Sequence, residues 1–302
     1  MELVRTVFRA MGSDCEIVAS GESADETRHA IGLAAREVLR IEHKFSRYRN
    51  DSNSIVNRIN QSAGRADVIA CDKETHQLLE LCSRIHALSG GLFDITSGVL
   101  RRAWDFGGGH VPDPAELSPL LDLIGWEKVA FDVHGIRLPR SGMEIDLGGI
   151  GKEYAADRAG LVLKNNSIKI GYVNLGGDIH VVGPQADGTP WRFGVQNPRE
   201  KSSLVGNIEL SSGGLVTSGD YVKFIESNGV RYCHILNPKT GYPPFCWRSV
   251  SVTGVSAVMA GACSTVAMLK ESEAVPFLDD MGCRYLLVDS EGRCTAAQAK
   301  SE

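Results

Sequence analysis

The segment 146–152, "DLGGIGK", places an acid, three glycines and a lysine just before a run with helical periodicity. Glycines let the backbone approach a ligand closely, and the N–H groups at the start of a helix can bind an anion. Lys152 adds a point charge that suits a phosphate. The spacing fits neither the Walker loop GxxxxGK[ST] nor the dinucleotide turn GxGxxG. The segment therefore predicts either a phosphate-binding turn of another type or a tight strand-to-helix turn without a ligand.

Three further turns carry side chains that could do chemistry. "NLGGDIH" presents Asp178 after a second Gly-Gly pair, and "VTSGDY" presents Asp220. "RYCHILNPKTG" places His234 in an expected strand before an Asn-Pro turn. Carboxylates and imidazoles can take a proton from an attacking hydroxyl, so Asp220 and His234 are candidate general bases. A histidine in such a strand is also compatible with a purely structural role.

An aromatic residue flanked by cations lies in the expected loop that follows the first helix. Tyr48 stands between Arg47 and Arg49 in "FSRYR". Such a segment is typical of an aromatic stacking face with cationic neighbours, and equally of a solvated loop.

The elements that must position these residues are strands with interspersed helices. Helical periodicity predicts helices at 23–43, 73–88, 149–164 and 257–272, and Ser23 with Glu26 forms a capping-box pattern. The intervening segment "FSRYRNDSNSIVNRINQSAGR" is polar and is expected to be a loop. Strands are expected at 3–20, 128–138, 172–183, 191–198, 206–219, 232–238, 248–256 and 283–294. This order favours an α+β fold with largely antiparallel or mixed sheets and flanking helices, in a single domain over 1–302 with a weakly signalled boundary near 100–115.

Composition narrows the class of protein further. The chain has 302 residues and a net charge of −5, so no basic surface for nucleic acid is indicated. No stretch reaches the roughly 18–20 apolar residues that a membrane helix needs, and the N-terminus lacks a secretory pattern. The eight cysteines include no CxxC pair, which favours reduced thiols. We expect a cytoplasmic protein without nucleic-acid or membrane partners.

Seven segments occur in an order that resembles the ApbE family, the FAD:protein FMN transferases. The resemblance extends from about Met11 to Leu269 and is most specific in the segments "DLGGIGK", "NLGGDI" and "HILNPKTGYP". The remaining four are "MGSDCEI", "FSRYRNDSNSIVNRIN", "SGGLFDITSG" and "VTSGDY".

The resemblance implies a set of ligand-binding residues. It implies FAD contacts at Met11, Tyr48, Leu92, Phe93, Asp94, Asp146, Lys152 and Ile235. It also implies a Mg²⁺ site that includes a backbone carbonyl near Gly149 and the hydroxyl of Thr265. The "DLGGIGK" turn would then hold the metal-bound pyrophosphate of FAD.

The resemblance further implies a reaction and a partner. A Thr or Ser hydroxyl of a target flavoprotein attacks the phosphorus on the FMN side of FAD, and AMP leaves. The divalent ion would stabilise the charge that develops on the phosphate oxygens. The resemblance does not identify the base, so Asp220 and His234 remain candidates by chemistry alone.

Two positions depart from the family pattern. The block A-D-A-x-[AS]-T, whose acid and threonine are Mg²⁺ ligands in the family, reads "AGACST" at 260–265, so Gly261 stands at the acid. Glu153 stands where the family usually has glycine, and it could supply a replacement carboxylate or point elsewhere. Three functions stay open: an active transferase with a rearranged metal site, an FAD-binding protein with weakened or lost transfer, and an FAD pyrophosphate hydrolase. Activity in Gly261→Asp would test whether the missing ligand matters.

Overall fold

The computed structural model describes residues 2–48 and 54–297, and its centre is an eight-stranded sheet in which every neighbouring pair is antiparallel. In spatial order the strands are β1 (Val4–Ala10), β2 (Ser13–Ser20), β5 (Ile170–Leu175), β6 (Asp178–Gly183), β9 (Gly213–Gly219), β12 (Trp247–Gly254), β13 (Arg284–Asp289) and β14 (Cys294–Ala297). The predicted α+β class with a largely antiparallel sheet is confirmed.

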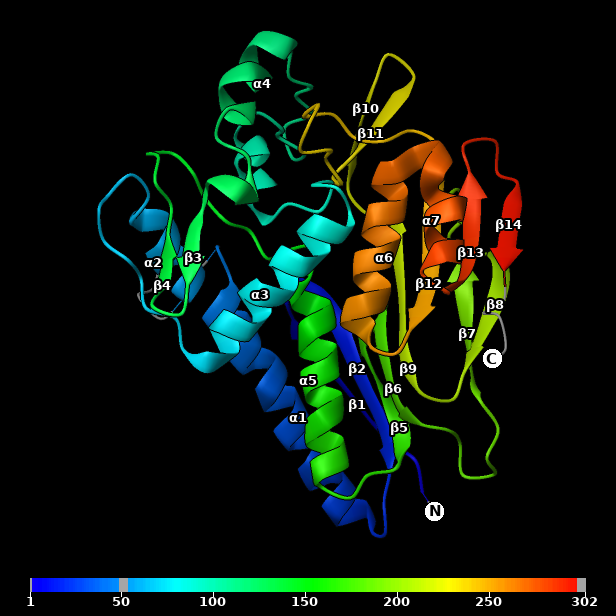
Figure 1. The fold of residues 1–302 in the computed structure, drawn as a ribbon. Helices are drawn as coiled ribbons and strands as arrows, with labels where there is room; N and C mark the ends of the chain where they lie inside the picture. Colours follow the sequence, from blue (N-terminus) through cyan, green and yellow to red (C-terminus); the bar gives the residue numbers. More distant parts are fainter. Residues whose placement is uncertain (1, 49–53, 298–302) are drawn as a thin grey trace.

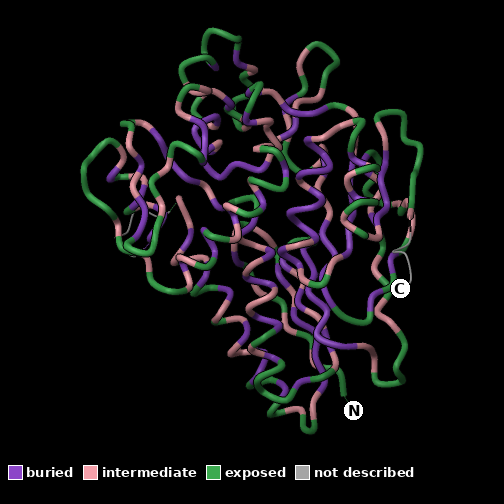
Figure 2. The backbone as a smooth tube through the Cα atoms, viewed as in Figure 1, coloured by how far each residue is buried: buried purple, intermediate pink, exposed green. Residues whose placement is uncertain are grey.

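Three long helices cover one face of this sheet (Figure 1). They are α1 (Ala24–Phe45), α5 (Gly151–Asn165) and α6 (Ala257–Lys270). Helix α6 is buried along most of its length because its small residues allow close approach to the strands, whereas α1 keeps a charged outer face. Figure 2 shows this difference as continuous burial in the central strands and α6, with exposed residues concentrated in the loops.

A short hairpin covers part of the opposite face. Its strands are β7 (Trp191–Gln196) and β8 (Leu204–Leu210). Ile179 and Val181 of β6 share an apolar cluster with Val195 and Ile208 of the hairpin. Alternation along a strand sends successive side chains to opposite faces, so β6 is buried on both faces.

Most of the remaining elements lie around the end of the sheet where the polar turns gather, whereas α7 (Ala274–Asp280) packs beside α6 against β12 and β13 (Figure 1). Two further hairpins are formed by β3 (Ala130–Asp132) with β4 (Gly135–Arg137), and by β10 (Phe224–Ser227) with β11 (Val230–Cys233). The other helices are α2 (Ile55–Gln61), α3 (Lys73–Leu88), α4 (Pro114–Leu121), α7 (Ala274–Asp280) and the 3₁₀ segments η1 (Ile95–Arg102), η2 (Trp126–Lys128) and η3 (Glu271–Glu273). Across residues 2–48 and 54–297, no helix has both the length and the apolarity to cross a bilayer.

The strongest helix predictions are confirmed. Helix α3 matches 73–88, and α1 begins after Ser23, whose hydroxyl oxygen accepts from the N–H of Glu26. The reciprocal half of the predicted capping box differs: the Ser23 hydroxyl, rather than its backbone N–H, donates to the Glu26 carboxylate at 2.9 Å.

Other expectations were wrong. The segment expected to be a polar loop contains α2, because Ser54 caps a turn that buries Ile55, Val56 and Ile59. His234 lies just after β11 rather than inside a strand, since that strand ends at Cys233. Helices α4 and α7 and strand β10 were not predicted.

Candidate active site

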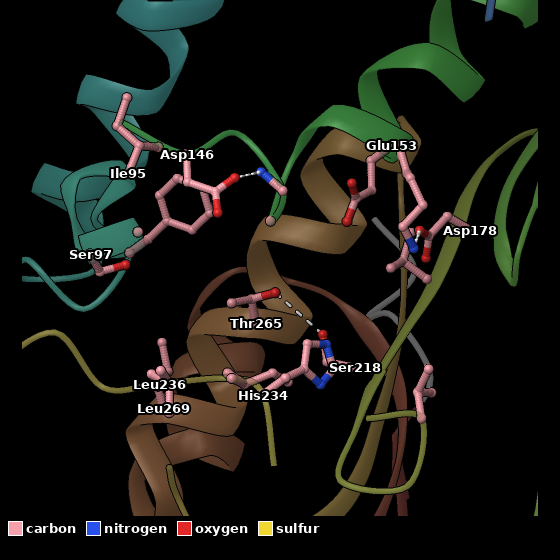
Figure 3. A pocket seen from close by; sticks show the side chains of 18 of the residues that line it. Ile95, Ser97, Asp146, Glu153, Asp178, Ser218, His234, Leu236, Thr265 and Leu269 are labelled. Atoms are coloured by element: carbon pink, nitrogen blue, oxygen red, sulfur yellow. Dashed lines mark hydrogen bonds and ion pairs between the residues drawn. The ribbon is translucent and has the colours of Figure 1, made fainter. Parts of the chain in front are cut away.

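A cavity of about 270 Å³ opens where the polar turns meet the N-terminal end of α5 and one face of α6 (Figure 3). Nine of the twelve residues predicted for the site line it. They are Leu92, Phe93, Asp94, Asp146, Gly149, Lys152, His234, Ile235 and Thr265. These residues come from four separate stretches of the chain, so the cavity is assembled by the tertiary fold.

The glycine turn before α5 is organised by the side chain of Asp146. Its Oδ1 accepts from the N–H of Gly148 at 2.8 Å, and its own N–H donates to the carbonyl of Ile95 at 2.7 Å. Its Oδ2 lies 3.2 Å from Arg47 Nη1 and 3.3 Å from Arg101 Nε. No described side chain caps the start of α5. The turn therefore presents glycine backbone and a helix N-terminus to the cavity, an arrangement that suits an anion.

Lys152 is held by an acid on the neighbouring strand. Its Nζ donates to Oδ2 of Asp178, at the start of β6, at 2.6 Å. Burial acts to lower the pKa of Lys152, but the charge and hydrogen bond of Asp178 and the charge of Glu153 together outweigh burial, so the pKa lies above its ordinary value. Lys152 thus stays charged and in a fixed place at the cavity wall.

Glu153 is buried between α5 and α6. It is 6% exposed, and its Oε2 has no hydrogen-bond partner among the described residues. A Cβ atom built at Gly261 would lie 2.7 Å from both Cγ and Oε1 of Glu153. Burial raises the pKa of Glu153 to about 8, and the charge of Asp178 acts in the same direction. The carboxylate therefore fills the space beside Gly261 and points toward α6 (Figure 3).

Hydroxyl groups line the cavity wall between β9 and α6. Ser218 Oγ lies 2.8 Å from Ser264 Oγ and 3.3 Å from Thr265 Oγ1. The Ser264 hydroxyl also bonds the carbonyl of Gly261 at 3.0 Å. Thr265 thus offers the cavity a neutral hydroxyl oxygen that could bind a cation, and this hydroxyl is held by its contact with Ser218.

The two candidate bases have different environments. The carbonyl of Lys223 lies 3.2 Å from His234 Nδ1 and can only accept, so Nδ1 carries the proton and neutral His234 has a free lone pair on Nε2. Burial lowers the pKa of His234 to about 4, with the charge of Arg101 acting in the same direction. Asp220 does not line the cavity, and both of its carboxylate oxygens accept from Arg199, at 2.7 and 2.6 Å.

The segment Leu92–Asp94 forms another wall of the cavity. Asp94 caps η1: its Oδ1 accepts from the backbone N–H and hydroxyl of Thr96, at 2.8 and 2.6 Å. Its Oδ2 accepts from the N–H of Trp126 at 3.0 Å. Since both oxygens are engaged, Asp94 fixes the loop that carries Leu92 and Phe93. Ser89 supports the same loop through a 2.9 Å bond from the N–H of Phe93 to its hydroxyl oxygen.

Met11 and Tyr48 lie outside the cavity lining. Met11 occupies the β1–β2 turn with a φ of +52°, and its N–H donates to Glu42 Oε1 at 2.8 Å. Two residues further on, Ser13 lines the cavity. Tyr48 is 70% exposed and its hydroxyl oxygen accepts from Nη1 of Arg101, a lining residue, at 2.9 Å. Tyr48 is therefore one contact away from the cavity, and Met11 is two residues away along the chain from a lining residue.

Several lining residues were not among the predicted site residues. Arg101 lies outside the matched segments, and only the fold brings it to the cavity, whereas Ser97 lies within the matched segment "SGGLFDITSG". Asp178 and Ser218 had a signal, since each lies in a glycine turn singled out in the sequence. Glu153 also had a signal, as a departure from the family pattern, but its direction depends on the packing of α5 on α6.

Comparison with known proteins agrees with this arrangement. The profile of the ApbE family matches residues 11–287. A FAD:protein FMN transferase from Klebsiella pneumoniae is 33% identical over 199 residues, which cover 64% of this chain and 61% of that protein. The chain thus spans less than two thirds of that relative's length.

Two solved structures are similar over almost the whole chain. The ApbE protein of Thermotoga maritima superposes with a TM-score of 0.90 at 31% identity, covering 100% of both chains. The flavin transferase ApbE of Vibrio cholerae superposes with a TM-score of 0.85 at 25% identity, covering 99% of this chain and 98% of the other. With a family profile that matches most of the chain and these two structures, the protein belongs to the ApbE family.

Proposed function

We propose that the protein is an FAD:protein FMN transferase, which moves the FMN part of FAD to a Thr or Ser of a target flavoprotein and releases AMP. The observation that carries this proposal is the cavity, which gathers nine of the twelve predicted site residues around a glycine turn. The activity of the Klebsiella relative supports the same reaction.

The chain's own residues suit the diphosphate part of FAD. Gly148 and Gly149 bring backbone to the cavity, and Lys152 adds a fixed positive charge there. Asp146 holds the turn through its bond to the N–H of Gly148. Phe93 and Ile235 add apolar side chains to the cavity lining, which suits an aromatic ring.

The donor set also fits a hard divalent cation such as Mg²⁺. Gly149 and Thr265 offer neutral oxygens, and an orphaned, buried carboxylate oxygen of Glu153 borders the same cavity. Hard cations take oxygen ligands with one or two carboxylates. When bound, Mg²⁺ would neutralise negative charge on the phosphate oxygens.

His234 is the base that the geometry favours. The acceptor hydroxyl forms a bond from its oxygen to the phosphorus on the FMN side, the bond from that phosphorus to the bridging oxygen breaks, and AMP leaves with that oxygen. His234 Nε2 takes the hydroxyl proton, because its Nδ1–H is fixed by the Lys223 carbonyl. Asp220 is the weaker candidate, since Arg199 engages both of its oxygens.

The test is incubation of the purified chain with FAD, Mg²⁺ and a flavoprotein domain that contains the acceptor hydroxyl. We expect flavin that stays on the target after acid denaturation, together with one AMP for each flavin transferred. FAD binding without AMP release would instead identify a binding protein. Free FMN and AMP without labelled target would identify a pyrophosphate hydrolase.

A further inference from the structure

We propose that Glu153 supplies the carboxylate ligand of the divalent-cation site, so that this chain has moved the acid from α6 to α5. The inference rests on the proposed function for the identity of the site, and concerns a position where the family pattern has glycine. The residue pair Glu153 and Gly261 carries the argument.

The first observation is that the side chain of Glu153 occupies the space that a side chain at position 261 would need. A Cβ atom at position 261 would lie 2.7 Å from Glu153 Cγ and Oε1, and 3.0 Å from its Cδ. Real Cβ atoms do not approach other heavy atoms this closely, so a side chain at 261 and the present Glu153 cannot coexist without a shift. The absence of a side chain at Gly261 therefore makes room for the side chain of Glu153.

The second observation is the direction of the carboxylate. Gly261 and Thr265 are four residues apart on α6, and residues at this spacing share one face of a helix. Because the Glu153 carboxylate lies against Gly261, it lies along the face that carries the Thr265 hydroxyl. Figure 3 shows it extending from α5 toward α6 on the same side of the cavity as Thr265. A carboxylate from α5 thus reaches the region that an acid at 261 would serve.

The third observation is that Glu153 has one carboxyl oxygen without a hydrogen bond to any described residue. It is 6% exposed, and its buried Oε2 has no hydrogen bond within the described ranges. Lys152, the adjacent cation, bonds Asp178 instead. An unpaired buried polar atom is costly, and a bound cation would remove that cost. A structural acid buried for packing alone would be expected to have a protein partner.

The experiment measures cation binding separately from catalysis. Flavin fluorescence quenching first reports FAD binding, and electron paramagnetic resonance of Mn²⁺ then gives the cation affinity of the FAD complex. The variants are Glu153→Gln, which keeps the side-chain volume, and Glu22→Gln, an exposed matched control. We expect Glu153→Gln to weaken Mn²⁺ binding about tenfold or more, because even outer-shell changes at metal sites cost about 10–100-fold. Glu22→Gln should not change it.

An exchange of the two residues gives a second, independent test. Gly261→Asp alone would place its side chain against Glu153, so it should not improve Mn²⁺ binding. The double variant Glu153→Gly with Gly261→Asp restores one carboxylate to the same face of α6, and should bind Mn²⁺ within a few-fold of the parent. Glu153→Gly alone should not. This rescue keeps the test valid even if Glu153→Gln folds poorly.

The outcomes separate the two proposals. Unchanged Mn²⁺ affinity in a folded Glu153→Gln variant, or no recovery in the exchanged variant, overturns the role of Glu153 and leaves the transferase proposal standing. A parent chain that binds Mn²⁺ through Glu153 but transfers no FMN overturns the proposed function and supports the site.

Discussion

Lys152 Nζ and Asp178 Oδ2 lie 2.6 Å apart and join the first turn of α5 to the start of β6. Asp178 is only 4% exposed, so its charge depends on this contact. Removing one partner of a buried ion pair leaves an uncompensated charge. The pair therefore links the stability of the fold to the position of a cavity cation.

We expect Lys152→Met to lower the free energy of unfolding by about 3 kcal/mol, near the lower end for a broken buried pair. The double variant Lys152→Met with Asp178→Asn should regain most of this loss, because no charge is left unpaired. Urea denaturation of the parent, both single variants and the double variant measures the coupling. Additive effects of the two substitutions would contradict a direct interaction.

Glycine should be the stabilising residue at position 261 only while the side chain of Glu153 occupies the space that a Cβ atom there would need. Alanine is favoured over glycine inside a helix by about 1 kcal/mol, whereas overpacking a core costs about 1–3 kcal/mol. We expect Gly261→Ala to destabilise the parent but to stabilise a Glu153→Ala background. Thermal and urea unfolding of the four proteins tests this change of sign. Stabilisation by Gly261→Ala in both backgrounds would show that the close approach is absent.

His234→Asn should slow FMN transfer about 10²–10⁴-fold, the usual contribution of a general base, while FAD binding stays within a few-fold of the parent. Since the pKa of His234 is about 4, its imidazole is neutral from pH 5.5 to 8, and the rate should not fall on its account in that range. Single-turnover transfer measured across this range checks both statements. A rate that drops with an apparent pKa near 6.5 would contradict the half-buried, neutral imidazole.

The same histidine should make the fold sensitive to acid. Its folded-state pKa of about 4 lies below the ordinary histidine value of 6.5, so the unfolded chain binds more protons between these two values. Stability from this group is complete above pH 6.5 and is lost as the pH falls toward 4. The free energy of unfolding of the parent should therefore fall more steeply than that of His234→Asn between pH 6.5 and 4.5. Equal slopes for the two proteins would contradict the prediction.

Asp220→Asn should slow FMN transfer less than His234→Asn does. The Asp220 carboxylate is engaged by Arg199 on both oxygens and lies outside the cavity lining. Comparing the two variants under single-turnover conditions assigns the base. A larger loss in Asp220→Asn would transfer the role of base to that residue.

Periodic patterns predicted most of the fold because they report which side of an element is buried. Helices α1 and α3 were predicted closely, since their apolar stripes are long and Ser23 marks the start of α1. Helix α2 was missed because only three apolar residues mark it within a polar segment. A short element depends on tertiary packing, which local sequence does not describe.

The site was predictable where a motif fixes the backbone conformation, and less predictable where the orientation of a side chain depends on its tertiary environment. Asp146 and Lys152 were found because glycines around them define the turn. The orientation of Glu153 was left open because it depends on an empty volume beside Gly261, on another helix and more than 100 residues away in the chain. Met11 and Tyr48 belong to matched segments, yet neither lines the cavity.

The cavity lining begins at Ser13 and ends at Leu269, and its remaining members are spread through the sequence between them. Such long separations must be closed before the pocket exists, and closing them is the slow part of assembling a mostly antiparallel sheet. Flavin dinucleotide should therefore have no affinity for partly folded chains and should raise the melting temperature as its concentration increases. The time at which flavin binding returns during refolding would then report when the whole sheet topology has formed.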